Sequence, residues 1–255
     1  MEGIKINKQK ALGTVVYIVE GKKDEHNIFK NIFEKIFSIE PIKCRSLKTD
    51  LLKYKLTNNR DSQVFILNSK DSSIHSLDNL DYIKNMFHKI NKELNIDIFN
   101  SAIYYIWDRD RESNSKEKIE EMIKKYYNSR DNEYELQGLL LLSYPSVESF
   151  MISCFEKPMP NEKIDNLKKY VKSNRYNADK IDDSKIEMAI KNFIESYRKI
   201  LNKDFNITDI DLSMSDINKS LFDFEEKYYN TNKFYYYFSC IMISLFDLGV
   251  FEIED

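Results

Sequence analysis

The stretch "TVVYIVEG", residues 14–21, decides the fold class that the sequence predicts. Aromatic and β-branched residues fill it, and charge appears only near its end, which is typical of a strand buried on both faces. After Gly21 the spacing becomes helical, because an apolar stripe from Ile28 to Phe37 alternates with charged residues until Pro41. A strand, a tight turn and a helix in this order predict a parallel sheet.

The same alternation continues along the first half of the chain. Strand patterns return at 62–70, 101–108 and 138–144, and helical spacing at 80–94 and 116–130. Strands that alternate with helices in this way are typical of layered α/β domains with right-handed crossovers. We therefore expect a first domain over residues 10–150, built as a mostly parallel sheet flanked by helices.

The character of the chain changes after Pro145. Amphipathic segments at 183–201 and 217–229 predict a helical C-terminal domain over residues 151–255, although 146–157 could belong to either domain. The most apolar run, 234–251, is interrupted by serines and an aspartate and is shorter than a membrane span needs. We expect this run to form a buried helix and no membrane contact.

Composition narrows the possible functions. The chain has 39 basic and 42 acidic residues, so its overall field does not predict a nucleic-acid or membrane partner. Cys44, Cys154 and Cys240 are far apart and form no CxxC pair, which argues against a disulfide framework and a zinc site. The first ten residues are charged where a signal peptide would be apolar. These features predict a cytoplasmic protein.

Carboxylates follow two of the predicted strands. Glu20 follows the first, and Asp108 and Asp110 follow a later one. Ligands bind outside the carboxyl ends of parallel strands, and carboxylates that converge there repel one another unless a cation such as Mg²⁺ relieves the repulsion. If the backbone stays extended, both aspartates point the same way and Arg109 points the other way. The plainer interpretation, a solvated loop or a helix cap, stays open.

Two segments resemble the TOPRIM domain, a Rossmann-like α/β module. They are "VVYIVEGKKDEHNIFKNIF" (15–33) and "IYYIWDRDRES" (103–113), which match its strand ending in Glu-Gly and its strand ending in Asp-x-Asp. The local form is similar to RloB-like and OLD-type bacterial defence proteins. "LLLLSYPSVESF" (139–150) is similar to a later RloB-like motif, except that Tyr144 replaces the usual Asn. The interval between the first two motifs is longer than in compact TOPRIM domains by a strand and helix at 62–95.

The resemblance implies a metal-dependent site. Asp108 and Asp110 would be ligands of Mg²⁺ or Mn²⁺, and Glu20 would be a ligand or the general base that acts on the attacking water. Glu148, which could equally be an exposed glutamate at a helix start, would complete a second metal site. Lys22 and Lys23 follow Glu20 and could hold a phosphate, or could simply be solvated.

The expected function is that of a nuclease that hydrolyses phosphodiester bonds in DNA or RNA, tRNA for instance, in bacterial anti-phage defence. The segment 165–180 is locally basic and carries two tyrosines that could stack on bases, although it could also be an ordinary solvated helix face. No Walker A loop is present, so a separate ATPase could control the protein. The alternative is a non-catalytic or partner-activated effector or regulatory subunit that binds a protein ATPase or a phosphate-bearing ligand. The chain could also form a homo-oligomer.

Overall fold

The computed structural model describes residues 3–21, 23–42, 52–57, 61–69, 74–130, 138–157, 166–201, 214–236 and 238–254. The chain divides into two compact units, each made of separate segments. Unit 1 contains residues 1–10, 108–120 and 141–255, and unit 2 contains residues 11–107 and 121–140. The predicted domain boundary at 150 and 151 therefore falls inside unit 1.

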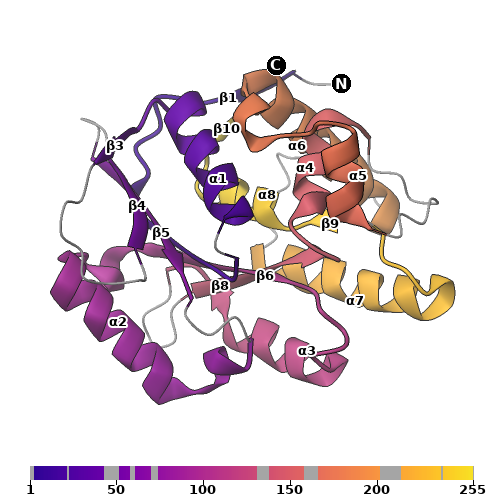
Figure 1. The fold of residues 1–255 in the computed structure, drawn as a ribbon, viewed down its shortest axis with the longest axis horizontal. Helices are drawn as coiled ribbons and strands as arrows, with labels where there is room; N and C mark the ends of the chain where they lie inside the picture. The colour runs from indigo at the N-terminus through magenta and orange to yellow at the C-terminus, as the bar shows by residue number, and fades with distance from the viewer. Residues whose placement is uncertain are drawn as a thin grey trace. The chain divides into compact units, whose positions relative to one another are not determined.

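The strands of unit 2 belong to a mixed, mostly parallel sheet (Figure 1). The order of its strands is β3-β4-β5-β2-β6-β8-β7. β2 lies between β5 and β6 and is parallel to both, whereas β4 and β7 are antiparallel to their neighbours. The bounds are β2 Gly13–Val19, β3 Glu40–Ile42, β4 Leu52–Thr57, β5 Ser62–Asn68, β6 Ala102–Asp108, β7 Tyr127–Asn128 and β8 Gly138–Tyr144. The predicted α/β class is confirmed, and the additional strand around 62–70 is β5.

The helices of unit 2 begin and end at local signals. α1 (Asp24–Asn31) continues into the π-helical turn η1 (Ile32–Ile36), and α2 spans Leu80–Leu94 as predicted. The side chain of Asn79 accepts a hydrogen bond from the Tyr82 N–H at the start of α2, and Asn95 ends it in the left-handed conformation. The short 3₁₀ turns η2 (Ile74–Asp78) and η3 (Ile98–Asn100) flank α2.

Aromatic side chains join α1 to the sheet. The Tyr17 ring stacks on Phe29 of α1 with centroids 4.1 Å apart, and on Tyr104 of β6 with centroids 5.1 Å apart. All three residues are fully buried. Because stacked rings of this size contribute more than their buried area alone, this cluster holds the helix after β2 against the two central strands.

Unit 1 is mainly helical. Its helices are α4 Glu148–Phe155, α5 Leu167–Ser173, α6 Asp183–Leu201, α7 Met214–Asn232 and α8 Ile241–Asp247, with the 3₁₀ turn η4 at Ala178–Lys180. β1 (Gly3–Ile6) pairs antiparallel with β10 (Phe251–Glu254). Within the parts of the chain that the structure describes, no helix is both long enough and apolar enough to cross a membrane.

Two predicted helices are wrong in part. The run 234–251 contains β9 (Phe238–Ser239) before α8 and turns into β10 after Gly249. α3 spans only Lys116–Lys125, and the residues after it form β7. In both places the backbone pairs with β8, so hydrogen bonding to a strand distant in sequence overrides the local apolar spacing.

We expect Gly138→Ala to destabilise the protein more than Gly13→Ala. Both glycines have positive φ values, +133° and +66°. A Cβ at Gly138 would lie 2.2 Å from Cε2 of Tyr105, whereas one at Gly13 meets no described atom within 4 Å. The free energy of unfolding of the Gly13 variant should therefore fall by only about 1–2 kcal/mol, because of its backbone conformation. That of the Gly138 variant should fall by roughly 1–3 kcal/mol more, because the added Cβ overpacks the site. Urea unfolding of both variants measures the difference, and equal losses would contradict the steric argument.

Candidate functional site

The turn after β2 is held by the end of β5. The Glu20 N–H donates to the Ile106 carbonyl at 3.2 Å, which continues the pairing of β2 with β6. The Asn68 side-chain amide donates to the carbonyls of Glu20 at 3.1 Å and Gly21 at 2.8 Å. A Cβ at Gly21 would lie 1.9 Å from Oε2 of Glu25, so this glycine lets the Glu25 carboxylate approach the turn. Glu20 itself is half-buried.

The two lysines after this turn are placed differently. Lys22 lies outside the described residues. Lys23 is exposed at the residue that precedes α1, and its carbonyl accepts from the Asn27 N–H at 3.0 Å. Their role in holding a phosphate stays a prediction.

Asp108 is held at the start of α4. Its Oδ1 accepts a hydrogen bond from the Val147 N–H at 2.9 Å, and Val147 directly precedes Glu148, the first residue of α4. The next residue along, Arg109, donates its backbone N–H to the Ser143 carbonyl at 2.9 Å. The carboxylate therefore satisfies an amide that a helix N-terminus would otherwise leave unpaired, and it lies beside the backbone of a second predicted ligand.

Glu148 is buried, with 5% of its surface exposed, so the interpretation as an exposed glutamate at a helix start is wrong. Its Oε2 accepts from the Ser146 hydroxyl at 2.6 Å. Its Oε1 lies 3.8 Å from the Lys168 ammonium, whose side chain is mostly exposed. A carboxylate so enclosed needs polar partners, and these two contacts supply them.

Asp110 closes its own turn. Its carboxylate accepts the N–H groups of Glu112 at 2.9 Å and Ser113 at 3.4 Å, as well as the Ser113 hydroxyl. The pKa of Asp110 is lowered, mainly by the hydrogen bond that its carboxylate accepts from the Ser113 hydroxyl. The backbone turns here, because the Asp110 N–H donates to the Asp108 carbonyl at 3.0 Å. The condition that the backbone stays extended through Asp110 is therefore not met, since local hydrogen bonds of Asp110 favour a turn.

The predicted carboxylates suit Mg²⁺ or Mn²⁺ in ligand type, since both ions prefer hard oxygen donors. Asp108, Asp110 and Glu148 belong to unit 1, whereas Glu20 belongs to unit 2. Across the described ranges, no group of three or more His, Cys, Asp or Glu side chains is arranged to hold a metal ion. The structure thus brings Asp108 to the start of α4, and the complete ligand set stays a prediction.

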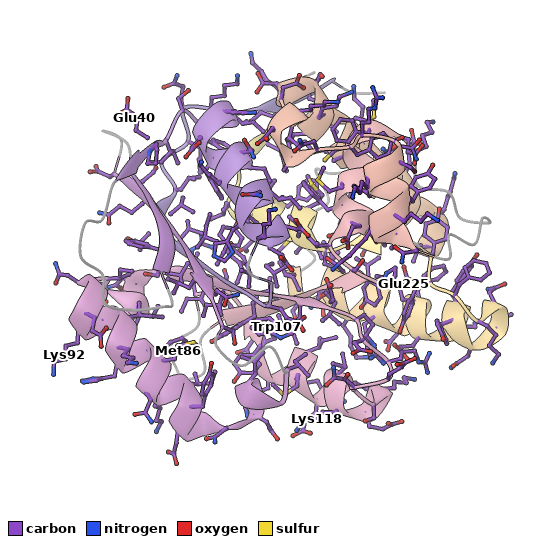
Figure 2. The ribbon with its side chains drawn as sticks, viewed as in Figure 1. Glu40, Met86, Lys92, Trp107, Lys118 and Glu225 are labelled. Carbon is purple, nitrogen blue, oxygen red and sulfur yellow. The ribbon has the colours of Figure 1, made fainter. Side chains whose placement is uncertain are left out.

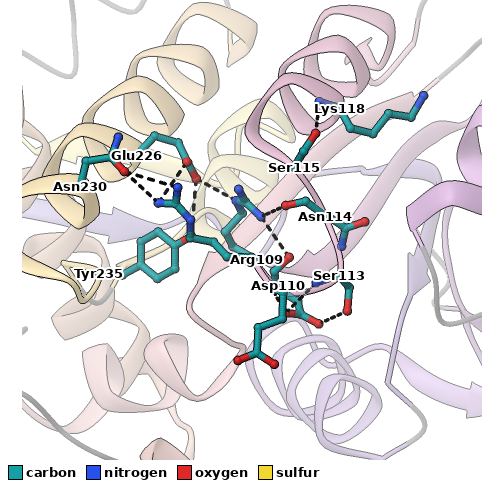
Figure 3. A network of polar contacts seen from close by, with 11 residues as sticks. Arg109, Asp110, Ser113, Asn114, Ser115, Lys118, Glu226, Asn230 and Tyr235 are labelled. Carbon is teal, nitrogen blue, oxygen red and sulfur yellow. Dashed lines mark hydrogen bonds and ion pairs between the residues drawn. The ribbon is translucent and has the colours of Figure 1, made fainter.

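A buried arginine holds the loop that carries Asp110 (Figure 3). Arg109 Nε donates to Glu226 Oε1 of α7 at 2.8 Å, and neither side chain has exposed surface. Its Nη1 donates to the carbonyls of Asp110 at 3.0 Å and Asn114 at 2.9 Å. One guanidinium therefore fixes both ends of the turn 110–114 and joins it to α7.

A second arginine reaches the same carboxylate. Arg111 lies 3.4 Å from Glu226 Oε2, and its guanidinium sits 4.3 Å from the centroid of the Tyr229 ring. It also donates to the Asn230 side chain at 3.4 Å. Glu226, Tyr229 and Asn230 lie three and four residues apart, so they share one face of α7.

Glu225, the neighbour of Glu226 on α7, is also buried in unit 1 (Figure 2). Its Oε2 accepts the Tyr236 N–H at 2.9 Å, and its Oε1 has no hydrogen-bond partner among the described residues. The pKa of Glu225 lies well above its usual value, mainly because burial disfavours the charged carboxylate. The hydroxyl of Tyr144 is buried likewise, and burial raises its pKa.

Sequence reasoning missed Arg109, Glu225 and Glu226 as structural partners. The available signal was in "LFDFEEKYY" (221–229), where the two glutamates follow Phe222 at the three- and four-residue spacing of the apolar face. Carboxylates on an apolar helix face need buried partners. The partner of Glu226 lies 117 residues earlier in the chain, which no local pattern reveals.

Glu226→Gln should destabilise the protein by about 3–5 kcal/mol, because it leaves the buried Arg109 charge without a counter-charge. The matched control is Asp223→Asn on the same helix, which breaks a more exposed ion pair with Lys219. The free energy of unfolding of that control should fall by no more than about 1 kcal/mol. Urea unfolding at neutral pH measures both, and similar losses would contradict the role given to Arg109.

Glu225→Gln should make unfolding less dependent on pH. Since the pKa of Glu225 is raised in the folded protein, the folded state binds the proton more tightly than the unfolded state. The stability that the protonated Glu225 contributes is fully present below the pKa that Glu225 has in the unfolded state. It is lost as the pH rises through the pKa that Glu225 has in the folded state. The variant should therefore gain stability relative to the wild type as the pH rises above the usual glutamate pKa of about 4.3, as measured by thermal unfolding at several pH values. Parallel curves for the two proteins would contradict this.

The chain was compared with protein-family models, with curated proteins and with solved structures. None of the three comparisons finds a match. The functional argument therefore depends on the residues and contacts described above and on the resemblance of its motifs.

Proposed function

We propose that this protein is a TOPRIM-like, metal-dependent endonuclease that hydrolyses phosphodiester bonds in DNA or RNA and acts in the cytoplasm in bacterial anti-phage defence. The observation that carries the proposal is the hydrogen bond between Asp108 and Val147. It joins the carboxylate at the end of β6 to the first turn of the helix that begins with Glu148.

The register of the central strands gives further support. β2 and β6 are parallel neighbours, and Val19 pairs with Ile106. Glu20 follows Val19 by one residue, and Asp108 follows Ile106 by two. Both carboxylates thus follow the carboxyl ends of adjacent parallel strands, which is where α/β sheets bind their ligands.

The proposed roles follow from residue type and placement. Asp108 and Glu148 would hold Mg²⁺ or Mn²⁺, and Asp110 would join them after releasing its bond to Ser113. When bound, the ion polarises the phosphoryl oxygen and lowers the pKa of bound water. Glu20 accepts a proton from the attacking water. Lys22 and Lys23 contribute positive charge toward the phosphate.

A second candidate function is that of a partner-activated subunit. The observation that favours it is the set of internal hydrogen bonds that already engage the carboxylates of Asp110 and Glu148. A separate ATPase, a second copy of the chain or a phosphate-bearing ligand would have to rearrange these contacts. In this case the isolated chain binds its partner but does not cleave nucleic acid.

Cleavage assays separate the two candidates. Labelled plasmid, single-stranded DNA and bulk tRNA are incubated with the protein and Mg²⁺ or Mn²⁺, using the wild type, Asp108→Asn, Glu20→Gln and the control Asp81→Asn. Asn keeps the oxygen that accepts from Val147, so the fold should survive. Loss of the general base should lower the rate by about 10²–10⁴, and Asp108→Asn should abolish metal-dependent cleavage. The exposed control should cleave like the wild type.

The other outcomes are equally informative. If the wild type cleaves no substrate with either metal, the partner-activated function is favoured. If both site variants cleave as fast as the wild type, the acidic residues are not catalytic and the nuclease mechanism proposed here is wrong.

A further inference from the structure

The helix α5 is fixed to α4 by one apolar face. Leu167 of α5 and Ile152 of α4 form a buried pair, and Tyr170 and Val171 pack against it. Tyr170 and Val171 lie three and four residues after Leu167, which places all three on the same side of the helix. The remaining positions of α5 carry polar and cationic side chains.

The two tyrosines in this segment are packing residues. Tyr176 stacks on Phe155 at the end of α4, with centroids 4.8 Å apart and planes 5° apart. Tyr170 meets the edge of Tyr176 at 6.4 Å. Both tyrosines are half-buried. The expectation that they could stack on bases is therefore not supported, since each already has an aromatic or apolar neighbour.

The outward side of this segment is basic. Between residues 166 and 180 the sequence has five cationic side chains and a single carboxylate, that of Asp179. The cationic residues, all exposed, are Lys168, Lys169, Lys172, Arg175 and Lys180. We call this set the α5 basic face. The whole chain carries a net charge of −3, so this concentration of positive charge is local.

The α5 basic face reaches the candidate metal site. Lys168 Nζ lies 3.8 Å from Oε1 of Glu148. The same Glu148 follows Val147, whose N–H bonds to Asp108. Lys168 thus brings one cation of this set to a carboxylate that the nuclease proposal uses.

We propose that the α5 basic face binds the sugar-phosphate backbone of the nucleic-acid substrate and directs it toward Glu148. The proposal rests on the nuclease function for the identity of the ligand. Because ammonium groups contact phosphates and the tyrosines are packed inward, binding here is electrostatic and independent of base sequence. Lys168 joins the bound backbone to the site.

The test measures binding without cleavage. Fluorescence anisotropy of labelled duplex DNA and labelled tRNA is recorded in EDTA at several salt concentrations, for the wild type and for the triple variant Lys169→Gln, Lys172→Gln, Arg175→Gln. The matched control removes three exposed lysines from α2 of the other unit: Lys84→Gln, Lys89→Gln, Lys92→Gln. Lys92 points into solvent (Figure 2). Lys168 is kept, so Glu148 retains its cation in every variant.

The α5 variant should bind at least about tenfold more weakly than the wild type. The slope of log K against log salt concentration should fall in magnitude by about 2–3, because each lost phosphate contact reduces that slope by roughly 0.7–0.9. The α2 control should bind like the wild type. Equal binding by the wild type and the α5 variant, equal losses in both variants, or no binding by the wild type would each overturn the proposal. Because EDTA stops cleavage, a loss confined to the α5 variant supports this surface even if the cleavage assay fails.

Discussion

The ion pair between Arg109 and Glu226 is the interaction on which the candidate site depends. A guanidinium without exposed surface must have a counter-charge and hydrogen-bond acceptors, because burying an unpaired charge costs several kcal/mol. Glu226 supplies the counter-charge, and the carbonyls of Asp110 and Asn114 supply the acceptors. The conformation of the loop after β6 is thereby determined by a helix more than 100 residues later in the chain.

This arrangement places Asp108 between two fixed groups. On one side, the backbone of Arg109 is bonded to Ser143 of β8, and on the other the Asp108 carboxylate is bonded to Val147 before α4. The carboxylate has little freedom, which suits a ligand that must be positioned before metal and substrate bind. Asp110 differs, because its partners are the amides and hydroxyl of its own exposed turn. Only the second carboxylate can change partners without disturbing the interior of unit 1.

Local patterns in the sequence predicted much of the fold. The central strands β2, β5 and β6 and the helices α2 and α6 lie where periodicity placed them, because each buries a regular apolar face. The two-residue strands β7 and β9 were missed, since they exist only by pairing with β8. The sequence left open whether Asp110 continues the strand or starts a loop, and its side-chain bonds to nearby amides favour the turn over an extended backbone. For the site, the pattern indicated the acidic residues, but the burial of Glu148 and the partners of Arg109 are tertiary contacts that no local pattern reveals.

The strand order of unit 2 has a consequence for how the chain behaves at high concentration. β3, at one end of the order, spans Glu40–Ile42, and β7, at the other, spans only Tyr127–Asn128. Outer strands this short offer few unpaired amides and carbonyls to a strand of another molecule. The longer, strongly apolar strands β2 and β6 lie inside the order, each with a neighbour on both sides. β3 and β7 themselves thus give little template for intermolecular strand addition, in a chain that is rich in isoleucine and tyrosine.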